Sequence, residues 1–347
     1  MGKKKRKEKK RKKLRTLILL LFLTIFMFGT STYAWFTANR VVNIESIDVH
    51  VETSDGIQIS SNGTTWKSTL TKADITGSAY TGANNFIPET LEAVSTAGDV
   101  SADSGKKTRL LNMFSSNVGT SPDGYTLSTT QVDESTELGK TKFVAFDIFL
   151  KVSSNKEVYL NTSDSSSNVV AKDTDRGLKN AARVAFVPIG ETSSTATSTE
   201  ITSAFYTSSP ASVKIWEPNN DTHSAAVVNS VGTEYGITGL AATGSSPVTY
   251  YGITTEIPTA KAQDLIKSVN GTIKQFDSTT FSKEIPSSIL VSTPTTLAAD
   301  TKIFDLKAGI TKMRVYMWVE GQDIDCENNA SGTDITFNVE LSIRESA

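Results

Sequence analysis

Alternation between apolar and polar residues predicts β-strands along most of the chain after residue 40. Segment 334–345 alternates most regularly, and its apolar set is Ile335, Phe337, Val339, Leu341 and Ile343. A period of two indicates a strand with one buried face and one exposed face. Segment 142–154 is apolar on both faces except for Asp147, which predicts a central strand covered on both sides. Segments 156–165, 181–190 and 312–323 predict further strands.

The first predicted strand is segment 43–53, in which alternation places Ile44 and Ile47 on opposite faces. Asp55-Gly56 follows it as a turn signal, so we expect a β-hairpin with the next apolar segment, 57–63. We also expect the C-terminal strands to pair with these early ones.

Helix signals are few. Segment 259–271 follows Pro258 and ends at Gly271, and segment 87–98 carries Pro88 in its first turn. Ser/Thr-rich segments 160–175, 190–212 and 219–249 are expected to be long loops.

The expected fold is therefore mostly β: an antiparallel, jelly-roll-like β-sandwich with long Ser/Thr-rich insertions around 160–260 and one or two short helices. A signal or transmembrane helix is expected to precede it. We favour a single domain over residues 35–347, and a division into two domains near 200–250 is the alternative.

The head of the chain has the pattern of an export signal. A basic segment precedes the apolar run 17–28, which is 12 residues long and too short to span a bilayer. Thr32 and Ala34 then supply small side chains two positions apart, the arrangement that a signal peptidase recognises. We place the cut after Ala34, which makes Trp35 the first residue of the mature chain.

A retained membrane anchor is the alternative to cleavage. Residues 16–36 contain no charge, and these 21 residues are long enough to cross a bilayer if they remain uncut. Both interpretations place the body outside the cytoplasm, either released or tethered at the cell surface.

The head and the body of the chain carry net charges of opposite sign. The net charge of -2 combines a strongly basic head with an acidic body, because residues 1–16 hold eleven of the 35 Lys and Arg residues and one of the 37 acidic residues. An acidic body argues against nucleic acid as a partner, since phosphate binding needs a basic surface.

The segment "STYAWFTANRVVNIESIDVHV" (31–51) resembles the start of bacterial, Firmicutes-like exported proteins that a SipW-type signal peptidase processes, the TasA- and camelysin-like family. The junction of small and aromatic residues, the polar spacer and the alternating strand carry the resemblance, which covers roughly residues 14–60. Family members often carry a "GTLDL"-like strand where this chain has "ESIDVHV". The resemblance implies an extracellular β-sandwich of the biofilm matrix that can polymerise through an N-terminal donor strand.

The leading functional hypothesis is thus a structural protein of the cell surface or extracellular matrix. In its sharper form, residues 35–51 insert into a neighbouring subunit as a missing strand and build a homopolymer. The candidate anchors of this donor strand are Phe36, Val41, Ile44, Ile47 and Val49. In its simpler form, the same strand folds into its own sheet. A surface module that binds glycan, assisted by calcium, is the alternative, and a secreted hydrolase is a distant third.

Catalytic motifs are missing from the sequence. The two histidines, His50 and His223, lie far apart, and neither a zinc-protease helix motif nor a G-x-S-x-G nucleophile elbow occurs. Phosphate-binding glycine loops are also missing. We therefore expect no enzymatic activity and no cofactor other than calcium.

One acidic cluster is a candidate for weak calcium binding, because calcium prefers oxygen ligands. Its members are Glu320, Asp323, Asp325 and Glu327. The spacing lacks the features of a calcium loop, so a solvated turn is the simpler interpretation.

Three tryptophans could form a glycan platform, but in a sandwich they are more often part of the core. We expect Trp318 in the core and Trp216 partly exposed, and for Trp66 both positions stay open.

Cys326 is the single cysteine of the chain, so an intramolecular disulfide is excluded. We expect it to be inert, and an intermolecular disulfide or a reactive thiol is the alternative.

Overall fold

The computed structural model describes part of the chain, and everything below concerns that part. The described residues are 42–51, 56–77, 85–94, 96, 98–121, 124–132, 134, 139–161, 167–171, 178–207, 213–217, 265–269, 272–276, 290–292, 301–321, 326 and 334–345. Within these ranges the chain is rich in β-strand, as the alternation predicted, and forms sheets of seven, six, four and two strands.

The seven-stranded sheet brings the two ends of the chain together. Its main path runs β17 (Thr301–Leu306), β10 (Lys156–Leu160), β19 (Asp334–Glu345), β1 (Val42–Val51) and β3 (Thr69–Thr71). Two short strands join it, β11 (Asn168–Ala171) on β19 and β4 (Thr90–Leu91) on β1. The expected pairing of C-terminal with early strands is confirmed, but β1 and β19 run parallel, so this sheet is mixed rather than antiparallel. Parallel pairing is open to them because no short turn has to connect the first strand to the last.

The six-stranded sheet holds the most apolar strands of the chain. Its order is β16 (Leu290–Ser292), β13 (Lys214–Glu217), β12 (Ala182–Thr192), β18 (Gly309–Val319), β9 (Val144–Val152) and β2 (Gln58–Ser60). Strand β9 lies inside this sheet between β18 and β2, and most of its residues are buried, which confirms the prediction of a central strand.

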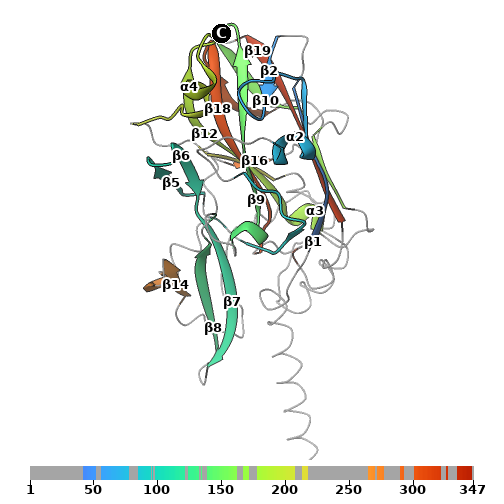
Figure 1. The fold of residues 1–347 in the computed structure, drawn as a ribbon. Helices are drawn as coiled ribbons and strands as arrows, with labels where there is room; N and C mark the ends of the chain where they lie inside the picture. The colour runs from blue at the N-terminus through green and yellow to red at the C-terminus, as the bar shows by residue number, and fades with distance from the viewer. Residues whose placement is uncertain are drawn as a thin grey trace, which may run out of the picture.

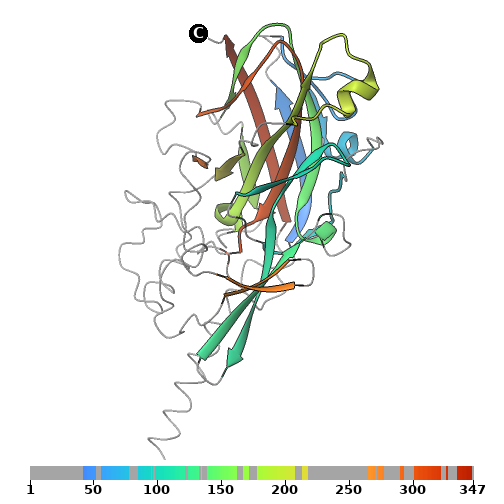
Figure 2. The ribbon, with the colours of Figure 1, turned by 90° about the vertical axis from the view of Figure 1, so that its left-hand side faces the viewer.

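One hydrophobic cluster lies between the two large sheets, whose strands Figures 1 and 2 show as two layers. Val315 and Met317 of β18 meet Phe337 and Val339 of β19 in this cluster, and all four are fully buried. The clean alternation of β19 thus points its apolar face at the other sheet, and burial of this face stabilises the fold.

The opposite face of the six-stranded sheet is covered by the described part of the segment between residues 94 and 143. This segment includes the two-stranded sheet of β5 (Val100–Asp103) and β6 (Thr108–Leu111). Leu111, Met113 and Phe143 pack there against Tyr316 and Trp318 of β18 in a second hydrophobic cluster. Strand β18 is therefore buried on both faces.

A long hairpin extends from this covering segment. Strands β7 (Met113–Ser121) and β8 (Gly124–Val132) pair along their full length, and both views show them running beyond the two large sheets. Strand β14 (Leu265–Val269) adds to β8 and pairs in turn with β15 (Thr272–Phe276).

The helices of the described residues are short. They are α2 (Lys72–Thr76), α3 (Leu178–Ala181), α4 (Ser198–Thr202) and a 3₁₀ turn at Gly139–Thr141. Thr71 and Asp74 form a reciprocal capping box at the start of α2, and Thr197 and Glu200 do the same at α4.

Both predicted helices are wrong where the structure describes them. Residues Leu265–Val269 of the segment 259–271 form strand β14. The next two residues, Asn270-Gly271, are a strong hairpin signal that outweighs the proline and the glycine stop. The segment 87–98 contributes the short strand Thr90–Leu91 and a bridge at Val94, because pairing with β1 and with Glu320 overrides its weak local helix preference.

The predicted hairpin between residues 43–53 and 57–63 is also wrong. Gly56 adopts a positive φ of 82°, but β2 joins the six-stranded sheet beside β9 while β1 stays in the other sheet. The turn therefore carries the chain from one sheet to the other, which alternation alone cannot distinguish from a hairpin.

Gly190 of β12 is a position where any side chain would collide with backbone. An added Cβ would lie 2.3 Å from the Phe205 nitrogen and 2.4 Å from the Ala204 carbonyl carbon. We expect Gly190→Ala to lower the free energy of unfolding by about 1–3 kcal/mol, because the strand has to move away from residues 204–205. Denaturant unfolding measures this, and Gly105→Ala is the control, since only a flexible carboxylate lies near its Cβ. Equal stability of the two variants would contradict the close packing.

Candidate functional site

Strand β1 is the described part of the candidate donor strand. Ile44, Ile47 and Val49 are buried in the cluster between the sheets, with exposed fractions of 5%, 0% and 1%. A β-bulge between Ile44 and Ser46 shifts the alternation by one residue. The expectation that Ile44 and Ile47 lie on opposite faces is therefore wrong, because the bulge directs both into the core.

Strand β1 is held on both edges by its own chain. It pairs in parallel with β19 from Asn43 to Val51, and on the other edge β4 and β3 pair with its two ends. The ring nitrogen Nδ1 of His50 lies 2.9 Å from the Thr69 hydroxyl, and the Asn43 amide donates to the Asp334 carboxylate at 3.2 Å. In this subunit, the strand occupies a complete site that a neighbour's strand could fill only by replacing it.

The residues predicted at the signal junction lie outside the described part of the chain. They are Thr32, Ala34 and Trp35, together with the candidate anchors Phe36 and Val41. Among the residues that the structure does describe, no helix has the length and hydropathy needed to cross a membrane.

The candidate calcium cluster is described only at Glu320. This residue is 2% exposed, and its carboxylate accepts a hydrogen bond of 3.1 Å from the Trp318 indole nitrogen. Asp323, Asp325 and Glu327 lie outside the described residues. Within the described ranges, no three His, Cys, Asp or Glu side chains gather closely enough to hold a metal ion.

The tryptophans divide between core and surface. Trp318 is fully buried, as expected, but Trp216 is only 1% exposed, so the prediction of a partly exposed ring is wrong. The ring of Trp216 belongs to the cluster between the sheets because β13 pairs with β12 and carries it inward. Trp66 is partly buried, with the Lys151 ammonium 5.3 Å from the centre of its ring. Cys326 is 2% exposed and also belongs to the core.

A buried cluster of charges lies under the covering segment, on the outer face of the six-stranded sheet. Asp147 of β9 and Arg314 of β18 are register partners, and an Arg314 Nη1–Asp147 Oδ1 hydrogen bond of 2.9 Å joins them. The second guanidinium nitrogen of Arg314 forms an ion pair with Glu134, which follows β8. Arg314 and Asp147 have no exposed side-chain surface, so this cluster fastens the covering segment to the sheet.

Lys312 extends the cluster to two further segments. Its ammonium donates to the carbonyl oxygens of Lys107 at 3.0 Å and Thr202 at 2.8 Å, and it lies 3.5 Å from Asp147 Oδ2. Burial lowers the pKa of Lys312, and the Asp147 charge opposes that shift. The side chain thereby ties β18 to the turn before β6 and to the end of α4.

Sequence reasoning identified Asp147 as the one charge on an apolar face but did not find its partners. The signal was present in β18, where Lys312 and Arg314 share one face with Tyr316 and Trp318. Two cations on the buried side of a strand require buried anions.

Tyr316 completes the cluster as a neutral donor. Its hydroxyl donates to Glu134 Oε1 at 2.6 Å and accepts from the Leu111 amide at 3.2 Å. Burial, together with the negative charge of Glu134, raises the pKa of Tyr316 well above its ordinary value of about 10.

We expect Tyr316→Phe to lower the free energy of unfolding by about 1–3 kcal/mol, since buried polar groups of Glu134 and Leu111 lose a partner. The folded pKa is raised, so the tyrosine contributes stability that is complete below pH of about 10 and is lost as the pH rises further. Urea unfolding between pH 8 and 11 measures both effects, and the variant should lose stability less steeply above pH 10. Parallel pH profiles of the two proteins would contradict this role.

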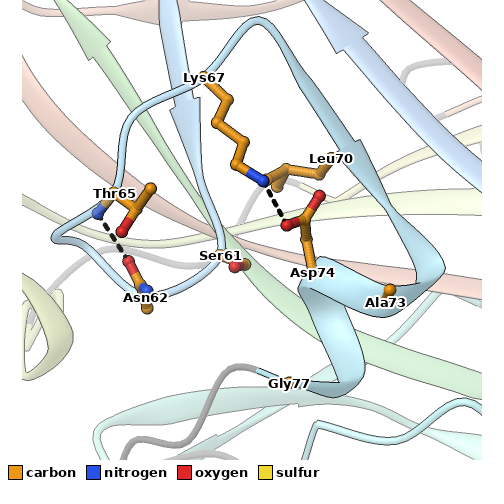
Figure 3. Close-up of a pocket in the computed structure, with 8 residues that line it drawn as sticks. All are labelled: Ser61, Asn62, Thr65, Lys67, Leu70, Ala73, Asp74 and Gly77. Atoms are coloured by element: carbon orange, nitrogen blue, oxygen red, sulfur yellow. Dashed lines mark hydrogen bonds and ion pairs between the residues drawn. The ribbon is translucent and has the colours of Figure 1, made fainter.

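A small hollow at the surface is lined by eight residues around α2 (Figure 3). Its volume is about 190 Å³, and the Lys67 ammonium and the Asp74 carboxylate lie 2.5 Å apart on one side of it. The Lys67 hydrogen bond is the main cause that lowers the pKa of Asp74. On the other side, the Asn62 side-chain oxygen accepts from the Thr65 amide at 2.9 Å. The polar groups of these two pairs thus bond within the chain, so they are not free to bind a ligand.

Comparisons with known proteins found no match that bears on the function of this chain. No protein-family model, no curated protein and no solved structure matches the chain.

Proposed function

We propose that the chain is an exported structural protein of the bacterial cell surface or extracellular matrix, which builds fibres by exchanging β1 between subunits. The observation that carries this proposal is the position of β1. An export-type signal pattern ends at residue 34, and the strand that joins the two ends of the body begins at Val42. Removal of the signal therefore frees the segment that leads directly into an interior strand of the seven-stranded sheet.

Exchange of β1 keeps nearly all of the contacts that the strand makes, because β1 would fill the same site in a neighbour that it fills in its own subunit. The main-chain pairing with β19 supplies affinity, and the pockets of Ile44, Ile47 and Val49 supply register. Swapping an identical element between subunits is a low-cost route to assembly, and a head-to-tail swap that does not close produces a fibre.

The finer architecture belongs to the same proposal. The two large sheets with their shared core are arranged as a β-sandwich of the jelly-roll type over residues 35–347. The role is structural rather than catalytic, with a signal peptidase and further copies of the chain as partners and no nucleic acid. Without cleavage after Ala34, the body would stay tethered to the membrane.

Electron microscopy of two purified forms tests this function. Residues 35–347 should form fibres at micromolar concentration, and the full chain of 347 residues in detergent should not, because the uncut head prevents insertion into a neighbour. N-terminal sequencing of the exported protein should give Trp35. Persistent monomers of residues 35–347 that bind glycan would replace this function with that of a surface binding module.

An engineered disulfide between β1 and β3 can hold β1 in its own subunit, because these two strands pair in antiparallel register. His50 and Thr69 are register partners, and the neighbouring Val51 amide donates to the Ser68 carbonyl at 2.8 Å. The His50–Thr69 pair is therefore the closely spaced kind without hydrogen bonds, about 4.5 Å between Cα atoms, which suits a disulfide. We call the His50→Cys/Thr69→Cys protein the locked variant, and Cys326 is too buried to compete for the new bond.

A further inference from the structure

Strand β7 presents an edge that differs from every other sheet edge among the described residues. It is the last strand of its sheet, and no described strand pairs with its outer side from Ser115 to Ser121. Strands β7 and β8 contain no Asp, Glu, Lys or Arg in nine residues each, whereas 21% of the whole chain is charged. Charge is the usual means of keeping an open edge from pairing with another chain.

The other described edges carry that protection or are short. On β17, Lys302 is paired with Glu157 at 2.5 Å and with Asp305 at 2.7 Å. Strands β2, β3 and β16 have three residues each, and β11 has four. Strand β15 contains Lys274 and β5 contains Asp103. Strand β4 has two residues, and β6 contains Arg109. Among the described sheet edges, a long edge without charge is thus specific to β7.

The hydrogen-bonding groups of this edge follow from its register. Ser121 pairs with Gly124 across a two-residue loop, and the residues that flank such a loop bond to each other. Odd-numbered residues of β7 therefore bond to β8, and the amides of Ser116, Val118 and Thr120 face away from it. Asn112 has the same parity, and its amide donates outward to the Asp99 carbonyl at 2.9 Å.

The hairpin already accepts strand addition on its other side, where β14 pairs with Ser128–Thr130 of β8. A hairpin that extends beyond the body needs such additions, since two strands alone are marginally stable in water. We propose that the outer edge of β7 pairs with the β7 edge of a second copy of this chain. The pairing is antiparallel and two-fold symmetric around Val118, and it sets Ser116 of one copy opposite Thr120 of the other.

An edge without charge does not repel its own copy, and this compatibility is the ground on which we take a second copy as the partner. A two-fold contact uses the same surface on both subunits and closes after two. It is separate from the exchange of β1, so it would join fibres side by side, or join monomers where no exchange occurs. The inference does not depend on the proposed function.

Sedimentation of the locked variant of residues 35–347 tests this contact alone, because the disulfide prevents exchange of β1. We expect a reversible monomer–dimer equilibrium. Val118→Pro removes the outward amide from both copies without touching the β8 ladder and should weaken the dimer about 10- to 100-fold. Val118→Ala keeps the amide and should leave the dimer unchanged.

Charge variants test the register without any risk to the hairpin backbone. Ser116→Lys/Thr120→Lys sets like charges opposite each other in the dimer and should abolish it at low salt. Ser116→Lys/Thr120→Glu sets opposite charges there and should preserve it. A monomer at all concentrations would overturn the proposal. Equal dimerisation of both charge variants, or of the proline variant and the parent, would overturn it as well. Loss of fibres with dimers intact would instead count only against exchange of β1.

Discussion

Replacing Arg314 with methionine should lower the free energy of unfolding by about 3–5 kcal/mol, the largest effect that we expect from a single substitution. Methionine fills much of the volume but leaves Asp147 and Glu134 without their shared cation. Breaking a buried ion pair by removing one partner is costly because an uncompensated buried charge remains. Lys312 lies 3.5 Å from Asp147 and cannot replace two direct contacts.

Denaturant unfolding at pH 7 measures this loss, with Lys302→Met as the matched control. Lys302 also forms ion pairs, with Glu157 and Asp305, but its side chain is 40% exposed. Exposed pairs contribute about 0–1 kcal/mol, so the control should stay within that range. A similar loss in both variants would show that burial of the Arg314 cluster does not matter. Hydrogen exchange should locate the weakening of Arg314→Met in the covering segment 94–143, which the cluster fastens.

Ile47→Ala should lower the free energy of unfolding by about 2–5 kcal/mol. Ile47 is fully buried at the centre of β1, and shortening it leaves a cavity between the two sheets. The substitution also reports on assembly, since an exchanged β1 would place the same side chain in the same pocket of a neighbour. Fibres of the variant should therefore dissolve at lower denaturant concentration than those of the parent protein.

Asn43→Ala is the control for this effect, because Asn43 lies on the exposed side of the same strand and its side-chain amide bonds to the partly buried Asp334. We expect a change within about 0.5 kcal/mol. Destabilised monomers with fibres of unchanged stability would contradict exchange of β1, because fibre contacts would then not involve the Ile47 pocket.

The strands were predictable wherever burial leaves a period of two in the sequence. Strands β9, β18 and β19 correspond to predicted segments because their apolar faces are continuous over nine or more residues. Their partners were less predictable, since alternation reports that a face is buried but not against which sheet. The turn at Gly56 shows this, as it joins two sheets instead of two paired strands.

Local irregularities explain the other differences. A single bulge after Ile44 reverses the face of every later residue in β1, and alternation counted from the first residue cannot detect it. The buried charges were not predictable as a cluster, because Glu134, Asp147 and Arg314 come from segments that only the fold brings together. Predictions at Thr32, Ala34, Trp35, Asp323 and Asp325 lie outside the described residues and stay predictions.

Electron microscopy of the locked variant, before and after reduction, tests the central claim most directly. With the disulfide between positions 50 and 69 formed, β1 cannot leave its own sheet, so residues 35–347 should yield no fibres. Reduction frees the strand, and the same sample should then form fibres like those of the parent protein. Fibres in the oxidised sample, with the disulfide shown by non-reducing electrophoresis to lie within one subunit, would contradict exchange of β1 as the basis of assembly.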